Sequence, residues 1–178
     1  MRGKAWILIG LFLLGGSGCR AYYRPVQTPT VPLSRYTSIH MPPMESEAFV
    51  RSLPGQHQPK YSEVIASGES LMASTAWAYL SERFSGAAEP GPGTLIVRTQ
   101  LTEFHPGNRA LRFFFGGYGA GRARLIVTCR LFDAETGAPV GMADAIAELR
   151  YGGQGGSVMR MFENCGAGIA RFIFDYYE

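Results

Sequence analysis

The strict alternation of side chains between residues 122 and 133 constrains the fold more than any other feature of this sequence. The apolar side chains fall on one side of an extended chain: Leu125, Val127, Cys129 and Leu131. The other side carries Arg124, Thr128 and Arg130, with Ile126 and Phe132 as exceptions. A period of two with β-branched residues is typical of a strand that buries one face. We therefore predict a half-buried strand over residues 122–133.

Turn signals flank this strand on both sides. The run 133–137 (DAETG) is polar and ends in Gly137, which can adopt positive φ, so a hairpin to a strand over 138–150 follows. Upstream, glycine occupies four of six positions: Gly116, Gly117, Gly119 and Gly121. Backbone conformations closed to residues with a Cβ are therefore expected there.

The glycine-rich turn allows two interpretations. An anion site would use the backbone of Gly117, Gly119 and Gly121 together with Arg109 and Arg112. Phosphate-cradling loops, however, lie between a strand and the N-terminus of a helix. Here a strand follows, which favours a structural turn over an anion site.

The remaining elements complete one domain over residues 34–178. Strands are predicted at 34–40 and 94–104, and residues 43–60 are irregular and rich in proline. Apolar residues at helical spacing predict helices over 61–84, with Ser62 as a possible cap, and over 157–177, opened by Ser157. The order β-α-β-β-β-α predicts an α+β two-layer sandwich: a mainly antiparallel sheet of about four strands with two helices on one face.

The outward rows of the strands carry charges of both signs. Arg98, Arg124 and Arg130 are expected near Asp144 and Glu148 on an exposed sheet face. Opposite charges on neighbouring strands contribute only about 0.2–1 kcal/mol each. A solvated face is favoured over a docking surface.

The N-terminus has the pattern of a secretory signal peptide over residues 1–18. Arg2 and Lys4 precede an apolar run over 5–14, which is shorter than the roughly 20 residues that a bilayer span needs. The residues before Cys19 resemble the end of a bacterial lipobox, although Gly16 stands where leucine is usual. Cys19 is therefore predicted as a lipid attachment site, in preference to a plain cleaved signal with an incidental cysteine.

Residues 19–33 would then form the lipidated N-terminus and a stiff, proline-rich tether. Arg20 follows the cysteine in place of aspartate, which by resemblance to the enterobacterial sorting rule favours the periplasmic side of the outer membrane. The expected partners are the membrane, through the lipid, and another envelope protein.

Charge and chemistry exclude several classes of function. Two of the 17 basic residues lie in the leader, which leaves 15 against 14 acidic residues, so we expect no nucleic-acid partner. His40, His57 and His105 are scattered without metal-ligand spacing, and we predict no metal, no cofactor and no catalytic residues. Cys129 and Cys165 both fall on core faces, where buried free thiols are favoured over a disulfide.

An ordered series of short motifs carries a family resemblance. They are Leu101–Phe104, Pro106–Arg109, Arg112, Gly117–Gly121, Leu125–Val127, Leu131–Asp133 and Thr136–Gly137. From about Ser34 to the C-terminus, the chain resembles an uncharacterised family of bacterial lipoproteins known as domain of unknown function 4410. The resemblance implies a small envelope domain without established activity. A lipid-anchored accessory module is the favoured function, and an anionic-ligand binder or enzyme at the glycine-rich turn is the alternative.

Overall fold

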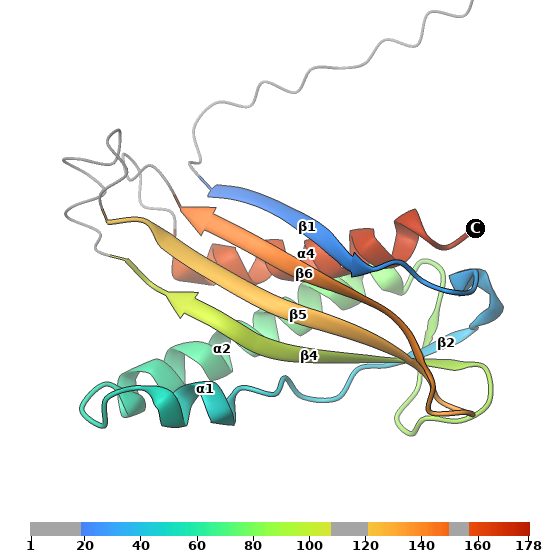
Figure 1. The fold of residues 1–178 in the computed structure, drawn as a ribbon, viewed down its shortest axis with the longest axis horizontal. Coiled ribbons are helices and arrows are strands. Elements are labelled where there is room, and N and C mark those ends of the chain that lie inside the picture. Colours follow the sequence, from blue (N-terminus) through green and yellow to red (C-terminus); the bar gives the residue numbers. More distant parts are fainter. Residues whose placement is uncertain (1–18, 108–120, 150–156) are drawn as a thin grey trace, which may run out of the picture.

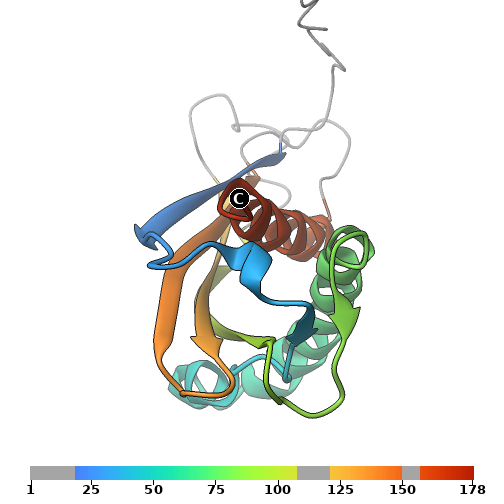
Figure 2. The same cartoon turned by 90° about the vertical axis from the view of Figure 1, so that its right-hand side faces the viewer.

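The computed structural model of the chain describes residues 19–107, 121–149 and 157–178. Within these ranges the fold is α+β, as predicted, with one six-stranded sheet and two long helices behind it (Figures 1 and 2). The strands are β1 (Cys19–Gln27), β2 (Ser38–His40), β3 (Ser85–Gly86), β4 (Thr94–His105), β5 (Ala123–Asp133) and β6 (Pro139–Leu149). The helices are α1 (Glu47–Ser52), α2 (Gln58–Leu80) and α4 (Val158–Asp175), with a 3₁₀ turn η1 (Leu33–Arg35).

The sheet is mixed and larger than predicted. Its strand order is β1-β6-β5-β4-β2-β3; the first four strands are antiparallel, while β2 runs parallel to β4 and β3. The prediction of about four strands missed β1 and β3. Strand β3 has only two residues, too few to produce a period that can be recognised in the sequence.

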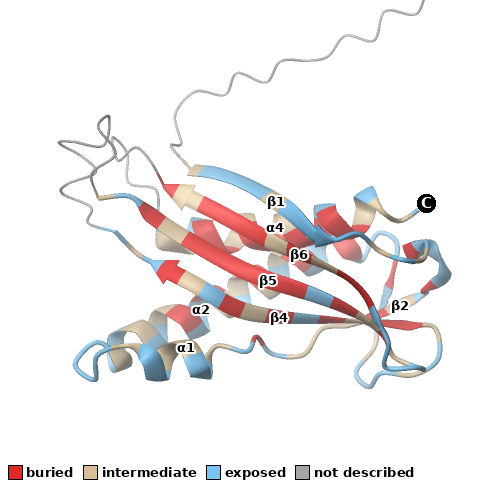
Figure 3. Cartoon of the chain, in the orientation of Figure 1, coloured by how far each residue is buried: buried red, intermediate tan, exposed pale blue. Residues whose placement is uncertain are grey.

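The bounds and the turn of the central hairpin agree with the prediction. Strands β5 and β6 begin and end within one residue of the predicted ranges. The predicted core side is buried, since Leu125, Val127, Cys129 and Leu131 are all buried. Burial is wider than a half-buried strand would show, because Ile126 and Thr128 on the other side of β5 are buried as well, and most of β5 is red in Figure 3. Gly137 has φ +70°, and its N–H donates to the carbonyl of Asp133 at 2.8 Å.

The predicted tether is instead largely part of the sheet. Residues from Cys19 to Gln27 form β1, which pairs with β6 along its length, Cys19 lying opposite Leu149. Beyond β1, Leu33 is fully buried, and its N–H donates to the carbonyl of Tyr176. Pro25 suggested a tether, but an edge strand tolerates proline because one side of its backbone needs no partner in the sheet.

The helices also shift from their predicted bounds. The region expected to be irregular contains α1, which has no buried residue, and the start of α2 at Gln58. Ser62 therefore lies inside α2 and does not cap it. Ser157 does cap α4, since its hydroxyl accepts from the N–H of Met159 at 3.1 Å. Among the described residues, no helix is both long and apolar enough to cross a bilayer.

Helices α2 and α4 approach each other closely through glycine. A Cβ on Gly68 would overlap the ring of Phe162, and one on Gly166 would overlap the carbonyl oxygen of Met72. Phe162 is fully buried, and its ring also lies 5.8 Å from that of Phe104 on β4. The core therefore depends on small residues at the helix crossing and on one large ring between helix and sheet.

Candidate functional site

Cys19 lies at one corner of the sheet, at the start of β1. Its partner Leu149 ends β6 and pairs in turn with Ala123, which begins β5. The thiol is half-buried against α4, where the Asn164 Nδ2 donates to the Cys19 Sγ at 2.8 Å. Burial, more than any other factor, raises the pKa of the Cys19 thiol. The residue predicted to carry lipid is therefore held in the domain itself.

A shallow groove of about 470 Å³ runs between β1 and α4 beside this corner. Small residues line much of it: Ala21, Ala167 and Gly168. Polar side chains close its far end, where the Tyr23 hydroxyl donates to Asp175 and Arg171 lies 3.7 Å from the same carboxylate. The groove is amphipathic, and its polar groups already have partners within the chain.

Most of the predicted anion site lies outside the described residues. This applies to Arg109, Arg112, Gly117 and Gly119. Gly121 is described and has φ +70°, a backbone conformation that favours glycine. The backbone at position 121 therefore has the conformation for which the sequence analysis expected glycine.

Cys129 and Cys165 are buried free thiols. Burial raises the pKa of Cys129 to about 12 and raises the pKa of Cys165 as well. The Cys165 Sγ faces the carbonyl oxygen of Ala145 at 3.5 Å. A thiol that stays protonated in an apolar environment behaves as a small hydrophobic side chain, and neither cysteine is suited to nucleophilic chemistry.

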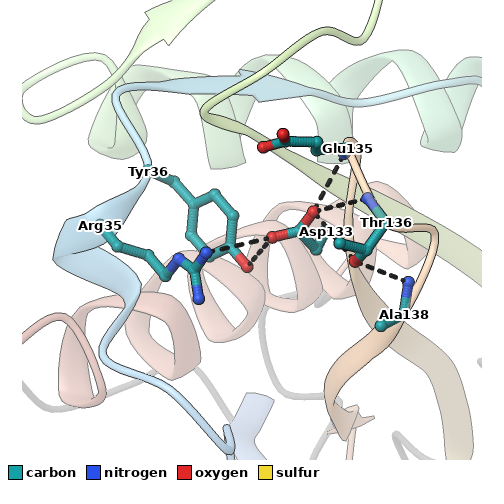
Figure 4. A network of polar contacts seen from close by, with 6 residues as sticks. All are labelled: Arg35, Tyr36, Asp133, Glu135, Thr136 and Ala138. Atoms are coloured by element: carbon teal, nitrogen blue, oxygen red, sulfur yellow. Dashed lines mark hydrogen bonds and ion pairs between the residues drawn. The ribbon is translucent and has the colours of Figure 1, made fainter.

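Asp133 is the centre of a polar network at the opposite end of the sheet (Figure 4). Its Oδ1 accepts from the N–H groups of Glu135 and Thr136, both at 2.9 Å, and from the Thr136 hydroxyl. Its Oδ2 accepts from the Tyr36 hydroxyl at 3.0 Å, and Arg35 lies 3.7 Å away. Burial, and then this hydrogen bond, raise the pKa of Tyr36 to about 12, so the phenol remains a donor. The network ties the hairpin turn to η1 and has a structural role.

This network makes stability depend on pH. Hydrogen bonds, chiefly from the Thr136 N–H, lower the pKa of Asp133. A lowered carboxyl pKa contributes stability above the unfolded value of about 3.9, and that stability is lost as pH falls through the folded value. Urea unfolding is expected to show Asp133→Asn as less stable than wild type at pH 7, with the difference shrinking towards pH 3. A difference that stays constant over this range would contradict the assignment.

The open face of the sheet, meaning the side that faces away from α2 and α4, carries the second candidate site. It comprises the outward residues of β1, β4, β5 and β6. Arg24 pairs with Asp144 at 2.7 Å, and Arg124 lies 3.7 Å from Glu103 and 3.8 Å from Glu148. These pairs place arginines and carboxylates in cross-strand rows on this face.

The expectation that three arginines lie near Asp144 and Glu148 is confirmed for Arg124, which lies near Glu148. Among the described residues, neither Arg98 nor Arg130 pairs with either carboxylate. Arg98 and Arg130 lie directly opposite each other on β4 and β5, and both are exposed. Within the described ranges, neither makes an ion pair or a side-chain hydrogen bond. Arg98 instead lies over the ring of Phe132, 5.2 Å from its centroid.

The reason lies in the strand order and register. Strand β5 separates Arg98 from β6, and Met142 lies opposite Arg130. Asp144 has other partners. Its Oδ2 accepts from Arg24 of β1, and its Oδ1 accepts from the Thr128 hydroxyl at 2.9 Å. Sequence reasoning missed Arg24 because the tether interpretation removed it from the sheet. The alternation of Tyr23, which contacts α4, with exposed Arg24 was the one signal available. The described part of the chain contains no group of three or more His, Cys, Asp or Glu side chains that could hold a metal ion.

Two solved structures show a weak similarity to this chain. A PelC dodecamer from Paraburkholderia phytofirmans that carries a point substitution aligns with a TM-score of 0.48 and 14% identity, covering 86% of this chain and 97% of that chain. A second PelC dodecamer from the same organism aligns with a TM-score of 0.44 and 15% identity, covering 86% and 95%. No curated protein matches the sequence.

The family comparison is more specific. Residues 56–152 match the family described as Domain of unknown function (DUF4410). This range extends from the N-terminus of α2 to just beyond β6 and includes the motifs of the central hairpin. It covers more than half of the chain, although it is shorter than the resemblance from about residue 34 to the C-terminus. The chain belongs to the family of proteins with Domain of unknown function (DUF4410).

Proposed function

We propose that this protein is a lipid-anchored accessory module of the bacterial envelope, facing the periplasm, that binds another envelope component and performs no catalysis. The observation that carries the proposal is the sequence pattern of residues 1–18, a basic start and an apolar run that end shortly before Cys19. One acyl chain holds a protein only marginally, at about 0.8 kcal/mol for each buried CH₂. Two or three chains on Cys19 therefore form a firm anchor.

The position of Cys19 supports a specific arrangement of the domain at the membrane. Since β1 begins at the anchored residue and pairs with β6 from its first residue, the domain has no spacer between lipid and sheet. The corner formed by Cys19, Leu149 and Ala123 then lies against the bilayer. The far end of the sheet, where Asp133 ties the hairpin to η1, points into the periplasm.

The remaining features favour an interaction module. The sequence has no nucleophile elbow, no paired zinc ligands on a helix and no CxxC motif. Arg20 after the cysteine favours the outer membrane. The open face offers Arg98 beside Phe132 and Arg130 beside Met142, residue types that are enriched at protein interfaces.

The anchor is tested by Cys19→Ser, with Cys129→Ala as the matched control. Wild type and the control are expected in the membrane fraction, with the mass of a lipidated polypeptide that begins at Cys19. The Cys19→Ser protein is expected to lose the lipid mass. Fractionation and intact-protein mass spectrometry measure both properties. Recovery of wild type from the cytosol with residues 1–18 attached would refute the anchor.

The accessory role needs a separate measurement, because an anchored enzyme would pass the first test. Crosslinking in intact cells, followed by purification of the wild-type protein, is expected to recover one envelope component reproducibly. Charge-reversal variants on the open face, such as Arg24→Glu, are expected to reduce that recovery. Recovery of no component above the level of an unrelated lipoprotein would contradict the role.

A further inference from the structure

Two arginines lie opposite each other on the open face, and neither has an acidic partner among the described residues. Arg98 of β4 and Arg130 of β5 form a directly opposed cross-strand pair. Residues directly opposite on antiparallel strands have Cβ atoms about 4.5–5.5 Å apart, and like charges at such positions destabilise a sheet. The two neighbours Val97 and Leu131 are fully buried on the helix side, so both guanidinium groups project from the other side.

The surroundings do not neutralise this pair. On β6, the residue opposite Arg130 is Met142, and Asp144 in the next outward row is bound to Arg24 and Thr128. On the other flank, Glu45 pairs with Gln100 through a bridge and makes no ion pair with either arginine in the described part of the chain. The two positive charges therefore lie in a row for which the described residues supply no counterion.

The arginine pair is also partly ordered before any ligand binds. The Arg98 guanidinium lies over the Phe132 ring, 5.2 Å from its centroid, in the range of a cation–π contact. The backbone of both residues is held in the central strands, whose register continues along β4 and β5 on each side. A group on a strand is positioned more precisely than one on a loop, so less conformational entropy is lost when a ligand binds.

We propose that Arg98 and Arg130 form a binding site for a phosphate-type oxyanion carried by a small soluble molecule. Guanidinium groups present parallel N–H donors that match the oxygens of a phosphate, and they bind it bidentately. An oxyanion between the two groups supplies the missing counterion and removes their mutual repulsion. Gln100 and Thr128, in the adjacent outward row, border the site with polar groups. This site differs from the one predicted at the glycine-rich turn, and it does not depend on the lipid anchor.

A titration of the purified full-length protein with inorganic phosphate and with pyrophosphate tests the site. The NMR signals of the Arg98 and Arg130 side-chain Nε–H groups are expected to shift saturably, with pyrophosphate binding more tightly. Sodium chloride at matched ionic strength is the control for screening. Shifts that are equal in chloride and in phosphate would overturn the proposal.

Substitutions distinguish binding by this arginine pair from nonspecific attraction to the charge of the surface. Arg98→Gln and Arg130→Gln are each expected to weaken pyrophosphate binding at least tenfold. Arg51→Gln, which removes an exposed arginine paired with Glu47 on α1, is expected to leave binding unchanged. Arg98→Lys keeps the charge without the fork of donors and is expected to bind with intermediate affinity. Equal binding by wild type and Arg98→Gln would overturn the assignment.

Measurements of stability show whether the variants are still folded. Because the two guanidinium groups repel each other, Arg130→Gln is expected to unfold at the same temperature as wild type, or a higher one, at low ionic strength. Pyrophosphate is expected to raise the unfolding temperature of wild type and not that of the variant. Association with phosphatidylglycerol vesicles and no response to soluble pyrophosphate would overturn the small-molecule site in favour of a membrane contact.

Discussion

Phe162→Ala is expected to destabilise the protein by about 3–5 kcal/mol, the range for removing a buried aromatic ring from a core. Phe162 is fully buried on α4, and its ring fills the space left by Gly68 on α2. The ring also meets Phe104 of β4 at 5.8 Å, so a cavity would open between both helices and the sheet. Urea unfolding followed by circular dichroism measures the loss.

Phe174→Ala on the same helix is the matched control. Phe174 is only partly buried and packs at the edge of the core, so its truncation is expected to cause a smaller loss. Equal losses for the two variants would show that Phe162 does not have the central packing role that the structure gives it.

Gly166→Ala is expected to destabilise the protein by about 1–3 kcal/mol or more, the usual effect of overpacking. The new Cβ would overlap the carbonyl oxygen of Met72 and lie 3.1 Å from the N–H nitrogen of Ala76. Both atoms belong to the backbone of α2, which cannot move aside as a flexible side chain can. The helices would have to separate, and thermal unfolding would show the effect.

Gly168→Ala, two residues further along α4, is expected to have the opposite sign. A Cβ at this position would lie 3.6 Å from the Ala145 Cβ, an ordinary van der Waals contact. Alanine is favoured over glycine inside a helix by about 0.5–1 kcal/mol, so this variant should be as stable as wild type or more stable. If both substitutions change stability equally, the close approach of α2 and α4 at Gly166 is wrong.

The central part of the fold could be predicted because its signals are local. Alternation over residues 122–133, the polar turn at 133–137 and the cap at Ser157 each depend on neighbours within a few positions. Backbone geometry converts such patterns directly into a strand, a hairpin and the start of a helix. The structure agrees with these three predictions to within about a residue.

The edge of the sheet could not be predicted in the same way. In β1 only Cys19 and Tyr23 are partly buried, so the segment has almost no apolar period, and Pro25 pointed to a tether. Its pairing with β6 depends on backbone groups separated by more than a hundred residues in the sequence. The error extended to the candidate site, since the placement of Arg24 decides which arginine Asp144 binds.

The sequence by itself determined the class of the fold, the central hairpin and the core side of its strands. Only the tertiary structure decided that Arg98 lies directly opposite Arg130, and that Gly166 lies against Met72. The physical reason is that local patterns fix which side of a strand or helix is apolar. Register between distant strands and the approach of two helices are fixed only when those faces pack together.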